Sequence, residues 1–390
     1  MSGYRRRLIR RDHGVTGYEF EGVERLKRLV DGGARVLIAP NHADHADGLA
    51  LYRLAEEVGT LFCQMATHHL FEGSFGLRYF IFPRVGVFPI DREGSALGAL
   101  RAAKDVLIRI GYPLVVYPEG EVYHTNDWLT PLREGAAAMG LTSQKALGKE
   151  TPVYVVPVSL KYFFLNPEEA AGHLARQVTG MEERFTLIPR PEQSLPRRIY
   201  RLASGILAVK EVEHLGEISS GTVSARIVLL RDKLLERLES LYLGRVGSDP
   251  LPERITAVHR CILEGLRSGE LGKDGEAASR SDLDVLFLVL QLFSYPGDYV
   301  QECPTVERIG ETVVKLAQDL GGGRYIKPAG ARRLTFSVGE PIDMRDHLGG
   351  KFRDAVPGVT RLLAQRLQDG LDQMGPGTHV DNLNLNHQNA

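Results

Sequence analysis

The sequence predicts an α/β protein interrupted by a helical insertion. Over residues 20–165, short apolar runs typical of strands alternate with longer segments whose apolar residues recur at helical spacing. From Pro167 to about Leu320 almost every segment has the helical pattern, and a strand pattern returns at Leu334–Ile342. Strands that alternate with helices form a sheet covered by helices, with functional side chains at the strands' carboxyl ends.

Composition narrows the class of protein. The 390 residues suffice for one large core or two domains, and 43% hydrophobic with 25% charged residues is typical of a globular protein. A formal net charge of −1 gives no general attraction to nucleic acid, so an anionic partner must be bound by a local patch. Cys63, Cys261 and Cys303 are far apart, which predicts neither a disulfide framework nor a metal cluster and fits a reducing cytoplasm.

Residues 1–19 are predicted as a basic N-terminal arm or short helix. Arginines are concentrated there (Arg5, Arg6, Arg7, Arg10 and Arg11), and no apolar stretch of the kind found in secretory signals follows them. Two interpretations stay open: attraction to anionic lipid headgroups, or a solvated tail. No run reaches the roughly 18 apolar residues that span a bilayer. We therefore expect a cytoplasmic protein, peripheral on the inner membrane face where it meets lipid, without a transmembrane helix or signal peptide.

The elements of the core follow from apolar spacing and from glycine and proline stops. Strands are expected at Arg35–Ala39, Thr60–Met65, Pro113–Tyr117 and Thr151–Leu160, and helices at Glu21–Val30, Leu49–Val58, Ser95–Ile110 and Arg133–Leu141. The first turn of the second helix is expected within Asp44–Gly48, so His42 and Asp47 lie on either side of a helix start.

The stretch from Asn41 to Asp47 follows a buried strand and is rich in histidine and aspartate. A neutral imidazole can take a proton from an alcohol, while a carboxylate on its other nitrogen fixes the tautomer and stabilises the imidazolium. Five residues across a strand-to-helix turn allow His42 and Asp47 to meet, where the helix dipole also favours the carboxylate. Taken alone, the pattern favours an Asp-rich helix N-cap with solvated histidines.

Three further stretches change this balance: Gly86–Arg92, Val115–Gly120 and Val153–Val158. Together with Asn41–Asp47 they make four stretches. In order and spacing, these four stretches resemble the motifs of the glycerolipid acyltransferase family, also called PlsC-like or lysophosphatidic acid acyltransferase-like. The Asn-His-x4-Asp motif is matched by Asn41, His42 and Asp47, the Asp-Arg motif by Asp91 and Arg92, the Pro-Glu-Gly motif by Pro118, Glu119 and Gly120, and the proline-centred strand by Pro157. Arg133 resembles the basic residue of the helix that follows the third motif. The resemblance covers roughly residues 20–165.

One motif departs from the family pattern. Pro-Glu-Gly is usually followed by a small hydroxyl residue and an arginine, whereas this chain has Glu121 and Val122. The missing cation weakens the prediction of a phosphate-bearing acceptor. Arg92 and Arg133 can still bind a phosphate through bidentate hydrogen bonds. The alternative for Arg92 is a surface ion pair with a neighbouring acidic residue.

The resemblance implies an acyltransferase-type mixed sheet flanked by helices and an enzyme of class EC 2.3.1, similar to 1-acylglycerol-3-phosphate O-acyltransferase of phospholipid biosynthesis. A fatty acyl group would pass from acyl-CoA or acyl carrier protein to a hydroxyl of a lysophospholipid, glycerol phosphate or related lipid. His42 would be the general base assisted by Asp47, and no metal or cofactor is expected. Residues implied in substrate binding are Asn41, Arg92, Pro118, Glu119, Gly120 and Arg133. Glu119 either contacts the acceptor or orders the catalytic turn.

Two rival functions remain compatible with the sequence. A thioester hydrolase would use the same base on water, and a catalytically silent acyl-lipid-binding protein would use its helices to recruit partners. The aromatic-rich stretch Leu70–Phe88 is either a wall for an acyl chain or ordinary core. The adjacent His68 and His69 lack a carboxylate or cysteine at metal-ligand spacing, so they predict no metal site.

Residues 166–328 are predicted as a helical insertion before the last sheet strand. Its helices are expected at Leu202–Val212, Val223–Leu243, Pro252–Leu266, Leu283–Phe293 and Val306–Leu320, with a polar loop at Gly272–Asp282. The basic stretch Pro196–Leu207 is either a solvated helix face or a docking surface for a membrane or an acidic acyl carrier. Residues 329–374 should return to the core as a closing strand and helix, and 375–390 form a disordered tail.

Overall fold

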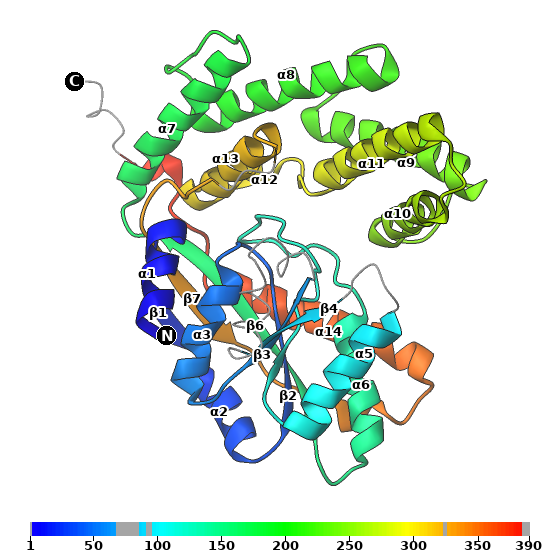
Figure 1. Ribbon diagram of the computed structural model, residues 1–390. Helices are drawn as coiled ribbons and strands as arrows, with labels where there is room; N and C mark the ends of the chain where they lie inside the picture. Colours follow the sequence, from blue (N-terminus) through cyan, green and yellow to red (C-terminus); the bar gives the residue numbers. More distant parts are fainter. Residues whose placement is uncertain (1, 68–85, 91–95, 323–325, 384–390) are drawn as a thin grey trace. The chain divides into compact units, whose positions relative to one another are not determined.

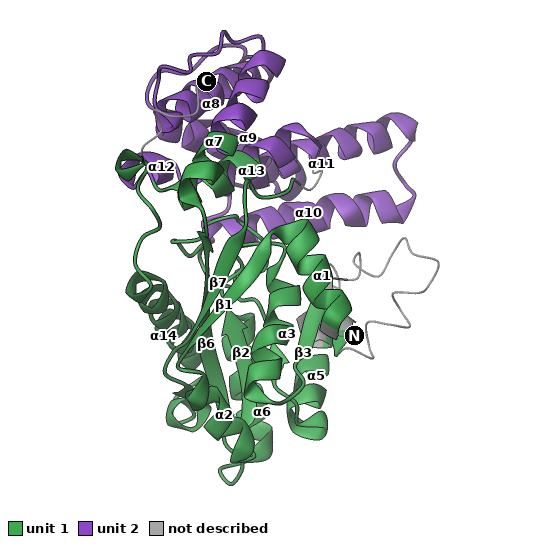
Figure 2. Cartoon of the chain, turned by 90° about the vertical axis from the view of Figure 1, so that its left-hand side faces the viewer, with its two compact units in different colours: residues 1–173, 305–315, 325–390 green, residues 174–304, 316–324 purple. Residues whose placement is uncertain are grey.

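The computed structural model describes residues 2–67, 86–90, 96–322 and 326–383. The chain divides into two compact units, drawn in different colours in Figure 2. Unit 1 comprises residues 1–173, 305–315 and 325–390, and unit 2 comprises residues 174–304 and 316–324. The helical insertion expected at 166–328 corresponds to unit 2 together with three short segments that belong to unit 1: 166–173, 305–315 and 325–328.

Unit 1 is organised around one mixed sheet, which confirms the fold class predicted from the sequence. Its described strands lie in the order β1 (Val15–Glu21), β7 (Arg332–Val338), β6 (Val153–Phe164), β2 (Arg35–Pro40), β5 (Leu114–Val115), β3 (Cys63–Thr67) and β4 (Val87–Ile90). β8 (Ile342–Asp343) pairs with β6 as well. The pairings of β6 with β7 and β8 are antiparallel, whereas β2 pairs in parallel with both β5 and β6.

Helices cover both faces of this sheet, as Figure 1 shows. One face carries α1 (Ser2–His13), α2 (Val23–Asp31) and α3 (Asp47–Val58). The other carries α5 (Ala96–Asp105), the π-helical turn η3 (Val106–Ile110), α6 (Gly135–Leu147) and α14 (Phe352–Gln373), and a 3-10 turn, η4 (Met344–His347), precedes α14. Along β2, Val36 and Ile38 pack toward the first group and Leu37 and Ala39 toward the second. A parallel strand buried on both faces is apolar throughout, which explains the continuous run in the sequence.

Two segments differ from the sequence-based expectation for unit 1. The predicted basic arm ends earlier, because Val15–Glu21 form β1 and pair in parallel with β7. The predicted disordered tail is ordered in its first part: Thr378 donates a backbone hydrogen bond to Glu307 over 2.8 Å, and the 3-10 turn η5 (Val380–Asn382) follows. Residues 384–390 lie outside the described residues.

Unit 2 is helical. It contains α8 (Leu195–Leu215), α9 (Val223–Leu243), α10 (Leu251–Ser268), α11 (Lys273–Phe293) and α12 (Tyr299–Glu302), while α7 (Pro167–Arg184) leads into it and α13 (Val306–Leu320) extends into it from unit 1. The polar loop expected at Gly272–Asp282 is instead the first half of α11, whose charged residues form the solvated side of an amphipathic helix. Among the described helices, none combines the length and the apolar character needed to cross a membrane.

The same pair of residue types recurs at three successive helix junctions of unit 2. Glu182 pairs with Arg198, Glu211 with Arg226, and Glu239 with Arg254, at sequence separations of 16, 15 and 15 residues. Each glutamate side chain is 0% exposed, and each arginine precedes an isoleucine that is buried in the unit (Ile199, Ile227 and Ile255). The regular spacing indicates a repeated structural unit of one helix, joined to the next by a buried charge pair.

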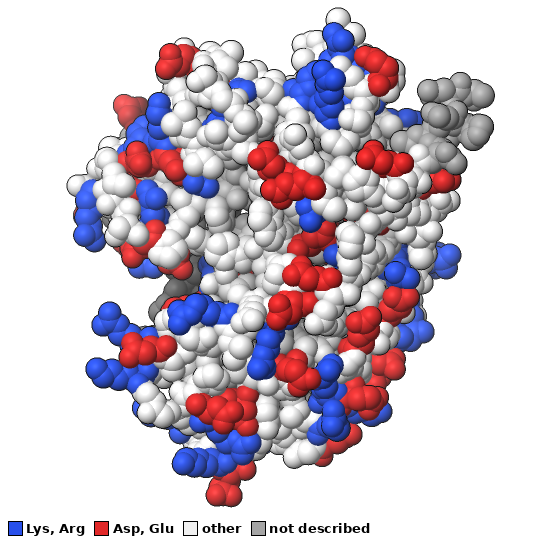
Figure 3. Space-filling view, turned by 180° about the vertical axis from the view of Figure 1, so that it is seen from behind, with Lys and Arg blue, Asp and Glu red and all other residues white. Residues whose placement is uncertain are grey.

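Two arginines of the basic stretch Pro196–Leu207 take part in the first of these junctions. Arg198 and Arg201 both turn to the buried Glu182, with nitrogen–oxygen distances of 2.6 and 2.8 Å. The charges of these two arginines are therefore paired within the unit, whereas Arg197 of the same stretch is exposed. Over the described part of the face drawn in Figure 3, acidic and basic side chains are interspersed, in keeping with a net charge of −1.

Candidate active site

The polar stretch after β2 forms a tight turn whose backbone is held by its own carboxylates. The Asp44 side chain accepts a hydrogen bond from the Ala46 backbone N–H over 2.8 Å, and the Asp47 side chain accepts one from the Asp44 N–H over 3.0 Å. Local side-chain-to-backbone bonds of this kind favour the break between a strand and a helix. α3 then begins at Asp47, which places this aspartate in the first helical turn.

His42 and Asp47 are hydrogen-bonded to each other in this turn. His42 Nδ1 lies 2.9 Å from Asp47 Oδ2, and the exposed fractions of the two side chains are 16% and 0%. With the Nδ1 proton shared with Asp47, the lone pair of the imidazole lies on Nε2, the nitrogen that can accept a proton. The geometry is that of a base held by a carboxylate.

The second oxygen of Asp47 is held by a residue that the sequence does not single out. The Tyr162 hydroxyl of β6 donates a hydrogen bond to Asp47 Oδ1 over 2.5 Å. Burial, together with the charge of Asp47, raises the pKa of Tyr162 well above its ordinary value, so the phenol stays protonated and remains a donor. His42, Tyr162 and the Asp44 backbone together fix the orientation of Asp47.

The Pro-Glu-Gly motif contributes a carboxylate that holds the turn Asn41–Asp47 from the other side. Glu119 is 3% exposed and accepts a hydrogen bond from the His42 backbone N–H over 2.7 Å. Its other oxygen accepts bonds from Thr130, from the N–H over 3.1 Å and from the hydroxyl over 2.6 Å. Burial raises the pKa of Glu119, while the bonds from Thr130 and His42 act in the opposite direction. Of the two roles expected for Glu119, this geometry supports ordering of the turn.

The neighbours of Glu119 form the turn itself. Gly120 has a φ of +84°, a left-handed conformation that glycine adopts without strain. The carbonyl of Pro118 accepts a hydrogen bond from the Arg133 N–H over 2.8 Å. The exposed Arg133 side chain lies beside the turn, close enough that a Cβ at Gly120 would come within 2.7 Å of Arg133 Nε. Contacts of Pro118, Gly120 and Arg133 with substrate stay predictions.

Asn41 is used differently from the expectation. Its amide nitrogen donates to the Leu160 carbonyl over 3.0 Å, its amide oxygen accepts from the Leu160 N–H over 2.6 Å, and the residue is 1% exposed. Both ends of the amide are therefore occupied by β6, so the predicted contact of Asn41 with substrate finds no support in its geometry. Asn41 instead fixes the end of β2 against β6.

Several predicted features fall outside the described residues. These are Asp91 and Arg92 of the second motif, His68 and His69, and most of the stretch Leu70–Phe88. The site is thus described from the first, third and fourth motifs. Within the described ranges, no group of three or more His, Cys, Asp or Glu side chains is arranged to hold a metal ion.

The structure adds a buried ion pair that anchors the turn Asn41–Asp47 to β7. Arg332 Nη1 lies 2.8 Å from Asp44 Oδ2, and Nη2 donates to the His13 carbonyl at the end of α1 over 2.8 Å. The Arg332 guanidinium also lies 4.6 Å above the centre of the Tyr162 ring. Burial alone would raise the pKa of Asp44, but Arg332 and His124 lower it to about 2. Asp44 was visible in the sequence as part of a polar stretch, whereas Arg332 had no local signal.

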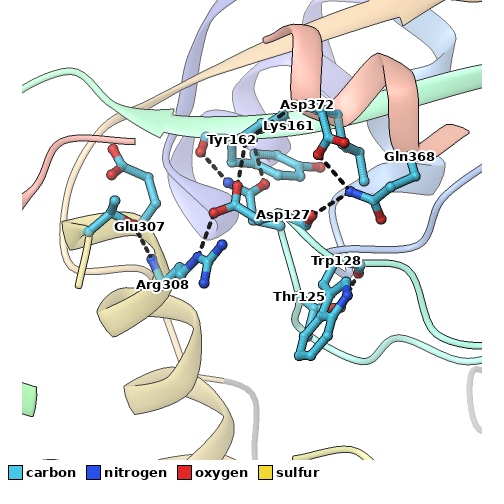
Figure 4. A network of polar contacts seen from close by, with 12 residues as sticks. Thr125, Asp127, Trp128, Lys161, Tyr162, Glu307, Arg308, Gln368 and Asp372 are labelled. Atoms are coloured by element: carbon cyan, nitrogen blue, oxygen red, sulfur yellow. Dashed lines mark hydrogen bonds and ion pairs between the residues drawn. The ribbon is translucent and has the colours of Figure 1, made fainter. Parts of the chain in front are cut away.

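The loop that carries Thr130 is held by a polar network drawn in Figure 4. Asp127 forms ion pairs with the buried Lys161 of β6 and with Arg308 of α13, the latter over 2.7 Å. Gln368 of α14 donates to the Asp127 carbonyl over 3.0 Å. Because Asp127 lies close to Thr130 in sequence, these contacts stabilise the segment that in turn holds Glu119.

Two comparisons with known proteins each match part of this chain. The family model described as Acyltransferase matches residues 17–161, a range that contains the described motifs of the site. A glycerol-3-phosphate acyltransferase from Shewanella woodyi is 31% identical over 154 residues, which are 37% of this chain and 18% of that relative. The chain therefore spans less than a fifth of the length of this relative.

Proposed function

We propose that the protein transfers a fatty acyl group to a hydroxyl of a lipid acceptor, because the family model described as Acyltransferase matches residues 17–161 and a glycerol-3-phosphate acyltransferase is 31% identical over 154 residues. The donor would be a thioester, acyl-CoA or acyl carrier protein, and the acceptor a lysophospholipid, glycerol phosphate or related alcohol. The observation that carries the proposal is the hydrogen bond between His42 and Asp47 at the end of β2.

The chemistry follows from the two side chains. His42 Nε2 removes the proton from the acceptor hydroxyl as its oxygen attacks the thioester carbonyl, and Asp47 stabilises the imidazolium that forms. When the tetrahedral intermediate collapses, the carbon–sulfur bond breaks and the thiolate takes the proton back from His42. One ester and one thiol result, so no covalent acyl-enzyme is needed.

Glu119 supports this step indirectly, by fixing the backbone of His42. Arg92 and Arg133 are proposed to bind an anionic group of the acceptor or donor, because a guanidinium can hold a phosphate by two parallel hydrogen bonds. Glu121 and Val122 replace the usual hydroxyl–arginine pair, which removes one cation that would bind a phosphate on the acceptor.

Product analysis tests the function. Purified protein and its His42→Ala variant are incubated with acyl-CoA or acyl carrier protein thioester, with glycerol 3-phosphate, lysophosphatidic acid or no acceptor, and products are identified by mass spectrometry. An ester that appears with wild-type protein and not with His42→Ala is expected. Free fatty acid formed at the same rate without acceptor would identify a hydrolase, and donor binding without any turnover would identify a silent binding protein.

A peripheral contact with anionic membrane is part of the same proposal. On α1, Arg7 and Arg10 are exposed, and Ile9 is buried against the sheet, which leaves the outward face of this helix cationic. Charged segments of this kind are attracted to anionic headgroups within a Debye length. Co-sedimentation with phosphatidylglycerol vesicles, compared with phosphatidylcholine vesicles and with an Arg7→Ala/Arg10→Ala variant, tests this contact.

A further inference from the structure

The imidazole of His42 is stacked against the ring of Tyr117. The two ring centroids lie 4.0 Å apart, and the ring planes differ by 21°. β5 and β2 are neighbours in parallel register, with Leu37 opposite Leu114 and Ile38 opposite Val115. Continued past the strand ends, the same register brings the residues before Pro118 beside the residues before His42. The stacked pair is thus delivered by two adjacent strands of the central sheet.

The hydroxyl of Tyr117 does not explain why a tyrosine stands here. Its oxygen is buried and has no hydrogen-bond partner among the described residues. A buried unpaired hydroxyl is unfavourable for folding, so a phenylalanine would fill the same place at no cost. The contact that Tyr117 makes with the site is the one through its ring face.

We propose that Tyr117 is a positioning residue that stabilises the protonated imidazole of His42 through its ring face. The face of an aromatic ring carries negative charge density and attracts a cation within about 6 Å of its centre. A proton on His42 turns the imidazole into such a cation at 4.0 Å. This inference rests on the proposed function in that His42 must become charged during the transfer step.

Asp47 and Tyr117 act on His42 from different directions. Asp47 bonds to Nδ1 at the edge of the ring, whereas Tyr117 covers one face of it. The Asp47 carboxylate restricts rotation of the imidazole within its own plane, and the stacked Tyr117 ring restricts tilting out of that plane. Both constraints keep His42 Nε2 pointing in one direction. Charge that develops on the imidazole in the transition state then meets a preorganised environment.

Other titratable groups around His42 must be considered when its protonation is measured. Those among the described residues are Asp44, His45 and Asp47 of its own turn, Glu119 after β5 and Tyr162 of β6. None of them is altered by a substitution at Tyr117, and a change in the titration of His42 can then be assigned to the lost ring face.

Two substitutions separate the ring face from the hydroxyl. Tyr117→Phe keeps the face and removes the hydroxyl, while Tyr117→Leu removes the face. The His42 ring signal is followed by NMR between pH 4 and 9, after assignment by its loss in His42→Gln. With Tyr117→Leu the midpoint is expected to move to lower pH by about half to one unit. With Tyr117→Phe it should stay within about 0.2 units, because the face is retained.

Kinetics provide the second readout. For Tyr117→Leu, the acid limb of the pH profile of kcat/KM should move by the same amount as the NMR midpoint. Its kcat should fall about three- to tenfold with KM changed less than about twofold, because the lost interaction acts on the charged base in the transition state. Tyr117→Phe should remain within about twofold of wild type, since the face that contacts His42 is unchanged.

The outcomes are distinct. An unchanged NMR midpoint in Tyr117→Leu, or an equal effect of Tyr117→Phe, would overturn the inference, the latter by assigning the effect to the hydroxyl. If Tyr117→Leu does not fold, Tyr117→Met tests the same loss with a longer side chain. Because the NMR titration needs no turnover, a shifted midpoint in a protein without acyl transfer would leave this inference standing while the proposed function fails.

Discussion

Arg332 and Asp44 are ion-paired at 2.8 Å although 288 residues separate them in the sequence. Arg332 begins β7, directly after the segment that returns from unit 2, and Asp44 lies within the turn that carries His42 and Asp47. The turn that carries His42 and Asp47 is therefore held in place by a strand that follows the helical insertion in the sequence. Since both side chains are largely buried, their charges depend on each other.

Replacing Arg332 by methionine should destabilise the protein by about 3–5 kcal/mol, because it leaves the buried Asp44 carboxylate without its cation. The measurement is urea unfolding followed by circular dichroism. Arg333→Met is the matched control: it removes the neighbouring arginine, whose partner Glu19 is 49% exposed, and should cost at most about 1 kcal/mol. Equal losses in the two variants would contradict the role given to Arg332.

The same pair predicts a pH dependence of stability. Asp44 has a pKa of about 2 in the folded protein, compared with 3.8 for the ordinary side chain. A lowered pKa contributes stability that is complete above about pH 4 and is lost as the pH falls toward 2, amounting to about 2 kcal/mol. The free energy of unfolding measured from pH 6 to 2 should therefore fall less steeply in Asp44→Asn. Asp31→Asn, at an exposed position, should keep the wild-type slope.

How much of this site can be predicted from sequence depends on distance along the chain. The strand, the turn and the meeting of His42 with Asp47 follow from spacing within a dozen residues, because local sterics and helix starts determine them. Tyr162 contacts Asp47 from 115 residues away, and Arg332 contacts Asp44 from 288 residues away. Hydrophobic periodicity in the sequence does not predict contacts between residues so far apart. Tyr117 is adjacent to a recognisable motif, but in sequence it is indistinguishable from any aromatic residue at a strand end.

Errors in the predicted fold also have physical causes. β1 is a short edge strand with a weak sequence signal. Its alternate residues Gly17, Glu19 and Glu21 are polar or small, so Tyr18 and Phe20 between them do not form a continuous apolar run. The first half of α11 has the composition of a loop, because its charged residues outnumber its apolar ones. In both cases packing on one side stabilises a segment whose composition favours solvent.

Tyr162 should contribute to catalysis through Asp47. In Tyr162→Phe, one Asp47 oxygen loses its hydrogen bond, so the carboxylate holds the imidazole less firmly. We expect kcat to fall about tenfold, the equivalent of about 1.4 kcal/mol, with KM nearly unchanged. Steady-state kinetics at saturating donor measure this. Tyr154→Phe, in the same strand but with its hydroxyl near Arg345, is the control and should behave as wild type.

Substitution of Glu119 distinguishes its two expected roles. In Glu119→Gln an NH2 group replaces one oxygen and faces either the His42 or the Thr130 N–H, so a donor meets a donor. If Glu119 orders the turn, kcat should fall by about ten- to a hundredfold with little change in KM for the acceptor, since the base is displaced. A rise in KM alone would instead indicate contact with the acceptor. Glu134→Gln, at an exposed position, controls for the loss of one negative charge.

The repeated charge pairs of unit 2 should behave as buried pairs do elsewhere. Arg226→Met leaves Glu211, 0% exposed, without its partner and should cost about 3–5 kcal/mol of local stability. Glu211→Leu combined with Arg226→Met should recover most of it, because an apolar pair of similar volume needs no desolvation. Hydrogen exchange of the α8 and α9 amides measures these changes. Lys210→Met is the control on the same helix, since its pair with Glu213 is exposed and contributes at most about 1 kcal/mol. The contrary outcome is amide exchange in the double variant that is as fast as in Arg226→Met. It would mean that removing the unpaired charge of Glu211 is not enough, and that the repeat depends on the hydrogen bonds between Glu211 and Arg226.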